Sequence, residues 1–82
     1  MAQDYAKARE WYEKAADKGY AYAMRSLGSL YRDGRGVVQD YVKAREWYEK
    51  AANKGDAAAK ARLEELAILE AGGVKKELGD SR

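Results

Sequence analysis

The residues of this 82-residue chain that could carry acid–base chemistry are glutamates, and they occur in two spaced pairs. Glu10 and Glu13 lie three residues apart, and Glu46 and Glu49 repeat this spacing further along the chain. Residues at this spacing are neighbours on a helix surface, as a general acid and a general base would need to be. Each glutamate also lies within a turn of a basic residue, so we interpret all four as solvated surface charges.

The composition offers few residues for other catalytic arrangements. The chain has no histidine and no cysteine, which removes the commonest metal ligand and the usual nucleophile–base pairs. Without cysteine, neither a disulfide nor a thiolate metal site can form. We therefore expect no enzymatic activity, no cofactor and no bound metal ion.

Two further motifs resemble ligand sites but have structural explanations. The glycine-rich motif Gly34–Gly36, with sequence GRG, contains an arginine, yet it follows a helix instead of opening one, which is the wrong polarity for a phosphate site. The aromatic pairs Trp11–Tyr12 and Trp47–Tyr48 could form a ligand cage, but each lies on an apolar helix stripe. We interpret the loop as a connection between helices and the aromatic residues as packing residues.

A stretch of seventeen residues occurs twice, and it indicates the architecture. Residues 3–19 read QDYAKAREWYEKAADKG, and residues 39–55 read QDYVKAREWYEKAANKG, so the two copies differ at two positions only. Self-similarity at a period of 36 residues predicts a solenoid of helical repeats. Such proteins generally present surfaces for binding.

Apolar periodicity predicts four helices, which we place at residues 4–18, 21–33, 40–54 and 57–71. In the third segment the apolar residues recur with the period of one helix face, between Asp40 as N-cap and Gly55 as the residue after the last turn. The sequence that follows the fourth segment is short and polar, and we expect residues 72–82 to be frayed.

Gly28 lies in the middle of the second predicted helix, where glycine costs about 1 kcal/mol relative to alanine. We expect it to allow another helix to approach closely. The corresponding position of the fourth helix holds Glu64. A carboxylate there is typical of a terminal repeat, which needs a polar outer face.

The motif in the middle of the chain resembles the repeat of the Sel1-like family. The sequence follows A-x-x-x-L-G-x-x-Y-x-x-G-x-G-V over residues 23–37 and D-x-x-K-A-x-x-W-Y-x-K-A-A-x-x-G over residues 40–55. The resemblance covers about residues 1–71, as one full repeat flanked by two half repeats. It implies an all-α, tetratricopeptide-like solenoid of antiparallel helix pairs, and members that hold protein complexes together.

The function that this resemblance implies is a non-catalytic protein–protein interaction module, an adaptor or scaffold. In solenoids the first helices of successive repeats line a concave side where partners bind. Tyrosine and arginine are also enriched in binding hot spots. On the outward face of the second helix we therefore expect a protein or peptide partner, of unknown identity, to contact Tyr22, Arg25, Ser29 and Arg32.

The alternative is a purely architectural unit, truncated or engineered, that associates with copies of itself. Its first helix lacks a partner before it, and its last helix lacks a partner after it. The apolar residues that would then lose cover in a monomer are Trp11 and Tyr12 at one end and Leu63 and Leu66 at the other. A contact between these two ends would give a head-to-tail homo-oligomer.

Charge and hydropathy argue against two further classes of partner. The 16 basic and 14 acidic residues give a net charge of +2 and are interleaved at helical spacing, unlike the clustered basic residues of nucleic-acid-binding proteins. No apolar run is typical of a signal peptide or a membrane span. We therefore expect no nucleic acid, no membrane association and, for the chain as written, a cytoplasmic location.

Overall fold

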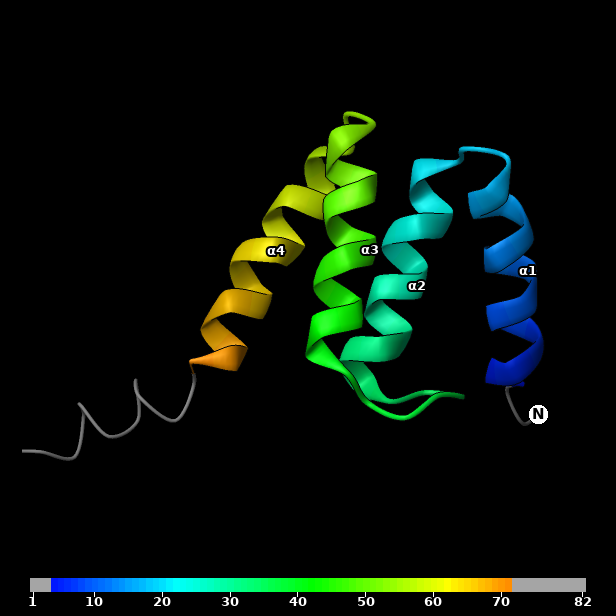
Figure 1. The fold of residues 1–82 in the computed structure, drawn as a ribbon, viewed down its shortest axis with the longest axis horizontal. Helices are drawn as coiled ribbons and strands as arrows, with labels where there is room; N and C mark the ends of the chain where they lie inside the picture. The colour runs from blue at the N-terminus through cyan, green and yellow to red at the C-terminus, as the bar shows by residue number, and fades with distance from the viewer. Residues whose placement is uncertain (1–3, 72–82) are drawn as a thin grey trace, which may run out of the picture.

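The structure, a computed structural model, describes residues 4–71, and these form four α-helices (Figure 1). The fold is all-α, as predicted. The helices run antiparallel to their neighbours and lie side by side in chain order: α1 Tyr5–Asp17, α2 Ala21–Asp33, α3 Tyr41–Asn53 and α4 Ala57–Glu70. The tail that we expect to be frayed, residues 72–82, lies outside the described residues.

Aspartate N-caps fix the start of three helices, and because Asp4 and Asp40 are caps and not helical residues, α1 and α3 begin one residue later than expected. The carboxylates of Asp4, Asp40 and Asp56 each accept a hydrogen bond from a backbone N–H two or three residues on, at 2.9–3.2 Å. These bonds satisfy N–H groups that have no partner inside the helix. At the start of α2 the N-cap is Tyr20, whose side chain makes no capping bond within residues 4–71.

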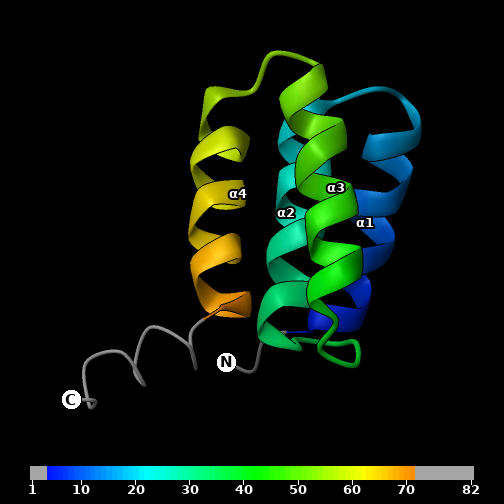
Figure 2. The ribbon, with the colours of Figure 1, turned by 60° about the vertical axis from the view of Figure 1, so that its left-hand side comes forward.

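The second helix is the centre of the packing (Figure 2). It lies against α1 on one side and against α3 on the other, and α3 also packs against α4. Small residues dominate the buried interior, so the helices approach closely. A first cluster of buried residues contains Ala15, Ala16, Ala23, Met24, Leu27, Leu30, Ala51 and Ala59, and a second contains Ala44, Tyr48 and Leu66.

The contact between α2 and α3 is built around Gly28. A Cβ atom added at Gly28 would lie 2.6 Å from two ring carbons of Tyr48 and 3.1 Å from the carbonyl oxygen of Ala44. The predicted close approach of another helix at Gly28 is therefore confirmed. Beside it, the hydroxyl groups of Ser29 and Tyr48 form a hydrogen bond of 2.8 Å, which satisfies the polar end of a buried tyrosine.

Three sequence-based expectations about packing need correction. Trp11, which we interpreted as a packing residue, is 74% exposed, because the described residues contain no helix that covers this side of α1. Its counterpart Trp47 is only partly buried against the first cluster. At the other end, Leu66 is 1% exposed and Leu63 is partly buried, because α3 covers both. The expectation that Leu66 loses part of its cover in a monomer is therefore wrong, whereas Leu63 is covered only in part.

Candidate protein-binding surfaces

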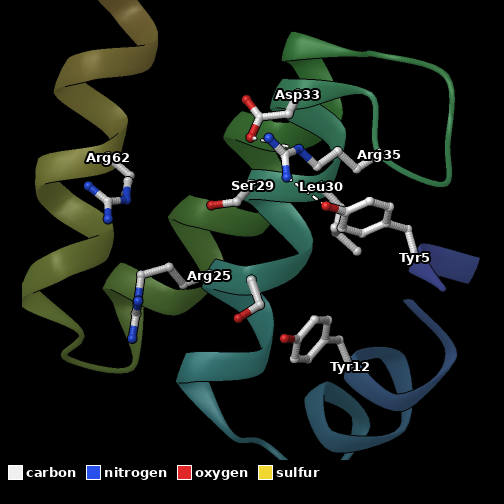
Figure 3. A pocket seen from close by; sticks show the side chains of 9 residues that line it. Tyr5, Tyr12, Arg25, Ser29, Leu30, Asp33, Arg35 and Arg62 are labelled. Carbon is white, nitrogen blue, oxygen red and sulfur yellow. Dashed lines mark hydrogen bonds and ion pairs between the residues drawn. The ribbon is translucent and has the colours of Figure 1, made fainter. Parts of the chain in front are cut away.

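A groove lies between α1 and α4, with α2 as its floor (Figure 3). We call it the α1–α4 groove, and its volume is about 230 Å³. Tyrosines from α1 form one wall, and an arginine from α4 stands on the other side. The residues that line it are Tyr5, Tyr12, Arg25, Ser26, Ser29, Leu30, Asp33, Arg35 and Arg62.

Arg35 joins the loop after α2 to the start of α1. Its Nη1 donates a hydrogen bond of 2.7 Å to the hydroxyl of Tyr5, and its guanidinium carbon lies 5.4 Å from the centre of the same ring. Gly36 makes this approach possible, since its φ is +76° and a Cβ there would lie 2.7 Å from the Cβ of Tyr5. The GRG loop that we interpreted as a connection therefore also places an arginine at the groove.

Arg25 joins the floor of the groove to α4. Its Nε donates to Oδ2 of Asp56 at 3.0 Å, while Oδ1 of Asp56 caps α4 by accepting from the backbone of Ala58 and Ala59. The hydrogen bond from Arg25 is the main reason that the pKa of Asp56 lies below its ordinary value. A carboxylate that accepts such bonds stays ionised at lower pH, so this connection holds throughout the neutral range.

The groove presents more positive than negative charge. Its lining contains three arginines and one aspartate, Asp33. Asp33 accepts two hydrogen bonds from Arg32, at 2.9 and 3.1 Å, and these lower its pKa. Because Asp33 is paired with Arg32 and Arg25 is paired with Asp56, Arg35 and Arg62 determine the electrostatic character of the groove. Guanidinium groups placed in this way can bind a carboxylate.

The structure brings together two of the four residues that we expected to contact a partner. Arg25 and Ser29 line the groove, although Ser29 also bonds to Tyr48. Tyr22 is 54% exposed but lines a different surface beside α1. Arg32 is outside the groove lining and is occupied by Asp33.

The sequence interpretation missed most of the groove residues. Because α1 and α3 both pack on α2, the buried part of α2 includes Met24 and Gly28 in addition to the apolar residues that we identified from the sequence. The exposed face of α2 is therefore narrower than we expected. Ser26 and Asp33 lie on the same face as Ser29 because they are three and four residues away from it on the helix. Tyr5 and Arg62 come from other helices, and no local pattern in the sequence brings them to α2.

A second surface, which we call the α1 flank, lies on the side of α1 where Trp11 is exposed. It encloses a shallow cavity of about 640 Å³. The rings of Tyr20 and Tyr22 stack beside it, with centres 6.1 Å apart and planes inclined by 21°. The lining residues are Lys7, Glu10, Trp11, Lys14, Ala15, Asp17, Lys18, Tyr20 and Tyr22.

Neither surface contains a metal-binding constellation. Over residues 4–71 there is no group of three or more histidine, cysteine, aspartate or glutamate side chains that could hold a metal ion. The glutamates with acid–base spacing lie at the protein surface: Glu10, Glu46 and Glu49 are exposed, and Glu13 lies 3.8 Å from Arg9. None of the four helices is long and apolar enough to cross a membrane.

Fold and surfaces together define a helical-repeat protein whose features are grooves between packed helices. The sequence profile of the Sel1 repeat matches residues 1–20 and 21–56. The chain belongs to the Sel1 repeat family, as its sequence motif predicted. The second match coincides with the unit formed by α2 and α3, which is the full repeat.

A solved structure supports the same assignment. The chain is similar to the crystal structure of a Sel1 repeat protein from Oxalobacter formigenes, with 34% sequence identity and a TM-score of 0.77. The similarity covers 85% of this chain but 29% of the other, so this chain spans less than a third of that protein's length. No curated protein matches the chain.

Proposed function

We propose that this chain is a non-catalytic adaptor module and that its α1–α4 groove binds an acidic segment of a partner protein. Sel1 repeat proteins are generally protein–protein interaction modules, which supports the first part. The second part rests on one observation: Arg35 and Arg62 stand with two tyrosines at a groove whose lining aspartate is paired with Arg32, while the third arginine of the lining, Arg25, is paired with Asp56.

The availability of the arginines favours a carboxylate ligand. Arg35 and Arg62 have side chains that are 55% and 39% exposed. The nearest carboxylate to Arg62 is that of Glu65, at 3.5 Å, which is the limit for a hydrogen bond. A planar guanidinium group recognises a carboxylate through two parallel hydrogen bonds. Tyrosines beside it add apolar contact area, and both residue types are frequent in binding hot spots.

The experiment is a selection of random twelve-residue peptides by the purified chain, followed by binding measurements on selected peptides. We expect enrichment of aspartate and glutamate among them, and affinity that falls with added salt. Arg62→Gln should weaken binding about tenfold or more, since a lost charge-assisted bond costs about 1.5–3 kcal/mol.

Lys60→Gln is the matched control, because it removes the same charge from the same helix at an exposed residue outside the groove. It should leave the affinity nearly unchanged. Equal losses for the two variants would mean that net charge, and not the groove, attracts the peptides. Selected peptides without acidic residues would contradict the proposal directly.

The architectural alternative, head-to-tail association of copies, ranks second. It needs α4 of one copy to pack on α1 of the next in the way that α2 packs on α3. Glu64 occupies the position of Gly28 in that arrangement, where not even a Cβ fits against the tyrosine ring. We therefore expect this chain to bind partners other than itself.

A further inference from the structure

Two hydroxyl groups of the α1–α4 groove are set up to donate hydrogen bonds to a ligand. The first is that of Tyr5, whose oxygen accepts a hydrogen bond from Nη1 of Arg35 at 2.7 Å. Because Arg35 supplies the hydrogen of this bond, the hydrogen of the Tyr5 hydroxyl itself is left for a third group. Tyr5 lines the groove (Figure 3), so this third group is an acceptor that enters there.

The second such hydroxyl belongs to Ser29, and its role follows from its buried partner. The hydroxyl oxygens of Ser29 and Tyr48 lie 2.8 Å apart, and Tyr48 is fully buried and makes no other side-chain hydrogen bond within residues 4–71. A buried phenol needs an acceptor for its hydrogen, so Tyr48 donates and Ser29 accepts. The hydrogen of the Ser29 hydroxyl is then directed to the groove, where Ser29 is only partly buried.

Two guanidinium groups stand beside these hydroxyls. Arg35 uses Nη1 for Tyr5, and its Nε lies 3.8 Å from Oδ2 of Asp33, so Nη2 is left for a ligand. Arg62 faces its nearest carboxylate at 3.5 Å only. The negative charge of Asp33 is offset by two hydrogen bonds from Arg32. The groove therefore combines positive charge with hydroxyl groups that need acceptors.

These donors exceed what a single carboxylate can use. A carboxylate presents two oxygens, whereas a phosphate monoester presents three and carries a charge of about −1.5 to −2 at pH 7. The lining also includes a third hydroxyl, that of Ser26. Most of the donors belong to α2, the loop after it and α4, and α1 contributes only Tyr5 to this set. The donor set matches a phosphate better than a carboxylate.

We propose that the α1–α4 groove binds a phosphorylated serine or threonine within the acidic segment of the partner. This inference rests on the proposed function and names the residue that the groove recognises. Arg35 and Arg62 supply charge-assisted hydrogen bonds to the phosphate, and the hydroxyls of Tyr5 and Ser29 bind the oxygen that a carboxylate lacks. Ser26 and Ser29 are only partly buried, so a short phosphorylated side chain reaches them.

The first measurement compares three fluorescent peptides that differ only at the central position. Each contains two aspartates on either side of a phosphoserine, a glutamate or a serine, and fluorescence anisotropy gives its affinity for the purified chain. The phosphoserine peptide should bind about tenfold more tightly than the glutamate peptide, as two additional hydrogen bonds would give. The serine peptide should bind most weakly. Equal affinities for phosphoserine and glutamate would overturn the inference.

The second measurement removes one hydroxyl donor. Tyr5→Phe keeps the aromatic ring beside Arg35 and loses only the hydroxyl. It should weaken binding of the phosphoserine peptide about threefold or more, as for one lost hydrogen bond, and leave binding of the glutamate peptide nearly unchanged. Tyr41→Phe is the matched control, because Tyr41 is the corresponding residue of α3 and lies outside the groove lining. Equal losses for the two peptides would show that this hydroxyl does not distinguish phosphate from carboxylate, against the inference.

The third measurement uses pH, because the chain contains no histidine and no cysteine. Carboxylates ordinarily titrate near pH 4, and the pKa of Asp33 in the groove is lowered further by its bond from Arg32. Phosphoserine, in contrast, gains its second negative charge near pH 6. Affinity for the phosphoserine peptide should therefore fall about threefold between pH 7 and pH 5.5, while that for the glutamate peptide stays constant. A fall shared by both peptides, or absent from both, would contradict recognition of the phosphate dianion.

The outcomes separate this inference from the proposed function. If acidic peptides bind through Arg62 but phosphoserine gives no gain, the acidic-segment proposal stands and this inference is wrong. If the phosphoserine peptide binds while the selected random peptides lack acidic residues, the groove recognises phosphate and the acidic-segment proposal is wrong. Inorganic phosphate, added as a competitor, should displace the phosphoserine peptide only at a much higher concentration than the unlabelled peptide does. Equal potency of the two competitors would mean that the groove binds a free anion and would overturn the inference.

Discussion

The stretches of residues 3–19 and 39–55 differ from each other at only two positions, yet the helices that they form have different surroundings. Tyr48 of α3 is fully buried, while Tyr12 of α1 is partly exposed. Trp47 packs partly against the core, while Trp11 is largely in solvent. The local sequence therefore sets which residues share a helix face, and the number of neighbouring helices decides whether that face is buried.

The starts of the two helices that follow these copies differ as well. Asp56 caps α4 and also accepts a hydrogen bond from Arg25 of α2, whereas Tyr20 at the corresponding position before α2 stacks on Tyr22. The second copy is thus followed by a residue that stabilises the fold, and the first by a residue that adds aromatic surface to the α1 flank. Corresponding positions of the repeat thus supply an exposed aromatic surface in one copy and a stabilising contact in the other.

The largest expected difference between the two copies concerns their tyrosines. Tyr48→Ala should lower the free energy of unfolding by about 3–5 kcal/mol, because it removes a fully buried aromatic ring. Tyr12→Ala should cost roughly half as much, because its ring is only partly buried. Urea denaturation followed by circular dichroism measures both. Equal costs would show that α1 and α3 are equally covered, against the structure.

A smaller effect is expected at the glycine that distinguishes α2 from α4. Gly28→Ala forces a Cβ against the ring of Tyr48, and overpacking of this kind costs about 1–3 kcal/mol. That cost exceeds the gain of about 1 kcal/mol from the better helix propensity of alanine. Glu64→Ala is the matched variant and should change stability by less than about 0.5 kcal/mol. A more stable Gly28→Ala protein would refute the close contact.

The smallest predicted effect is the loss of stability at acidic pH. The pKa of Asp56 is lowered in the folded chain by its bond from Arg25, so the unfolded chain binds more protons near and below its own aspartate pKa of about 3.9. This contribution is complete above that pH and is lost as the pH falls through the folded pKa. Asp56→Asn keeps a capping oxygen but should lose this part of the pH dependence, less than about 1 kcal/mol.

Urea denaturation at pH 6 and pH 3 tests this prediction. The parent should lose more stability between the two values than the Asp56→Asn variant does. Asp17→Asn serves as the control, because Asp17 is exposed and the corresponding residue of α3 is already Asn53. If the parent and the Asp56→Asn variant lose equal stability, the bond between Arg25 and Asp56 does not contribute to folding.

Features that depend on local sequence were predictable from the sequence. The helix starts follow from aspartate caps, and the close approach at Gly28 follows from the cost of glycine inside a helix. Membership of the repeat family follows from the motif over residues 23–55, which describes one complete packing unit. In each case the residues that carry the evidence are also the residues that make the contact.

Features that depend on neighbouring helices were not predictable in the same way. The apolar stripe of α1 gives no indication that Trp11 is exposed, since Trp47 lies in the same local sequence. The α1–α4 groove combines Tyr5, Arg35 and Arg62 from three separate segments, and only the packing of α2 between α1 and α3 brings them together. Leu66 was expected to lose part of its cover, but it is buried because it packs against Ala44 and Tyr48 of α3.

The accessibility of the two tryptophans tests the central claim, that α1 and α3 differ in cover and not in sequence, most directly. Trp47→Phe leaves Trp11 as the sole emitter, and Trp11→Phe leaves Trp47. Acrylamide quenching should be nearly as efficient for Trp11 as for free N-acetyltryptophanamide, and several-fold weaker for Trp47. Equal and weak quenching of both residues in the dilute protein would mean that the α1 flank is already covered, and would contradict this account.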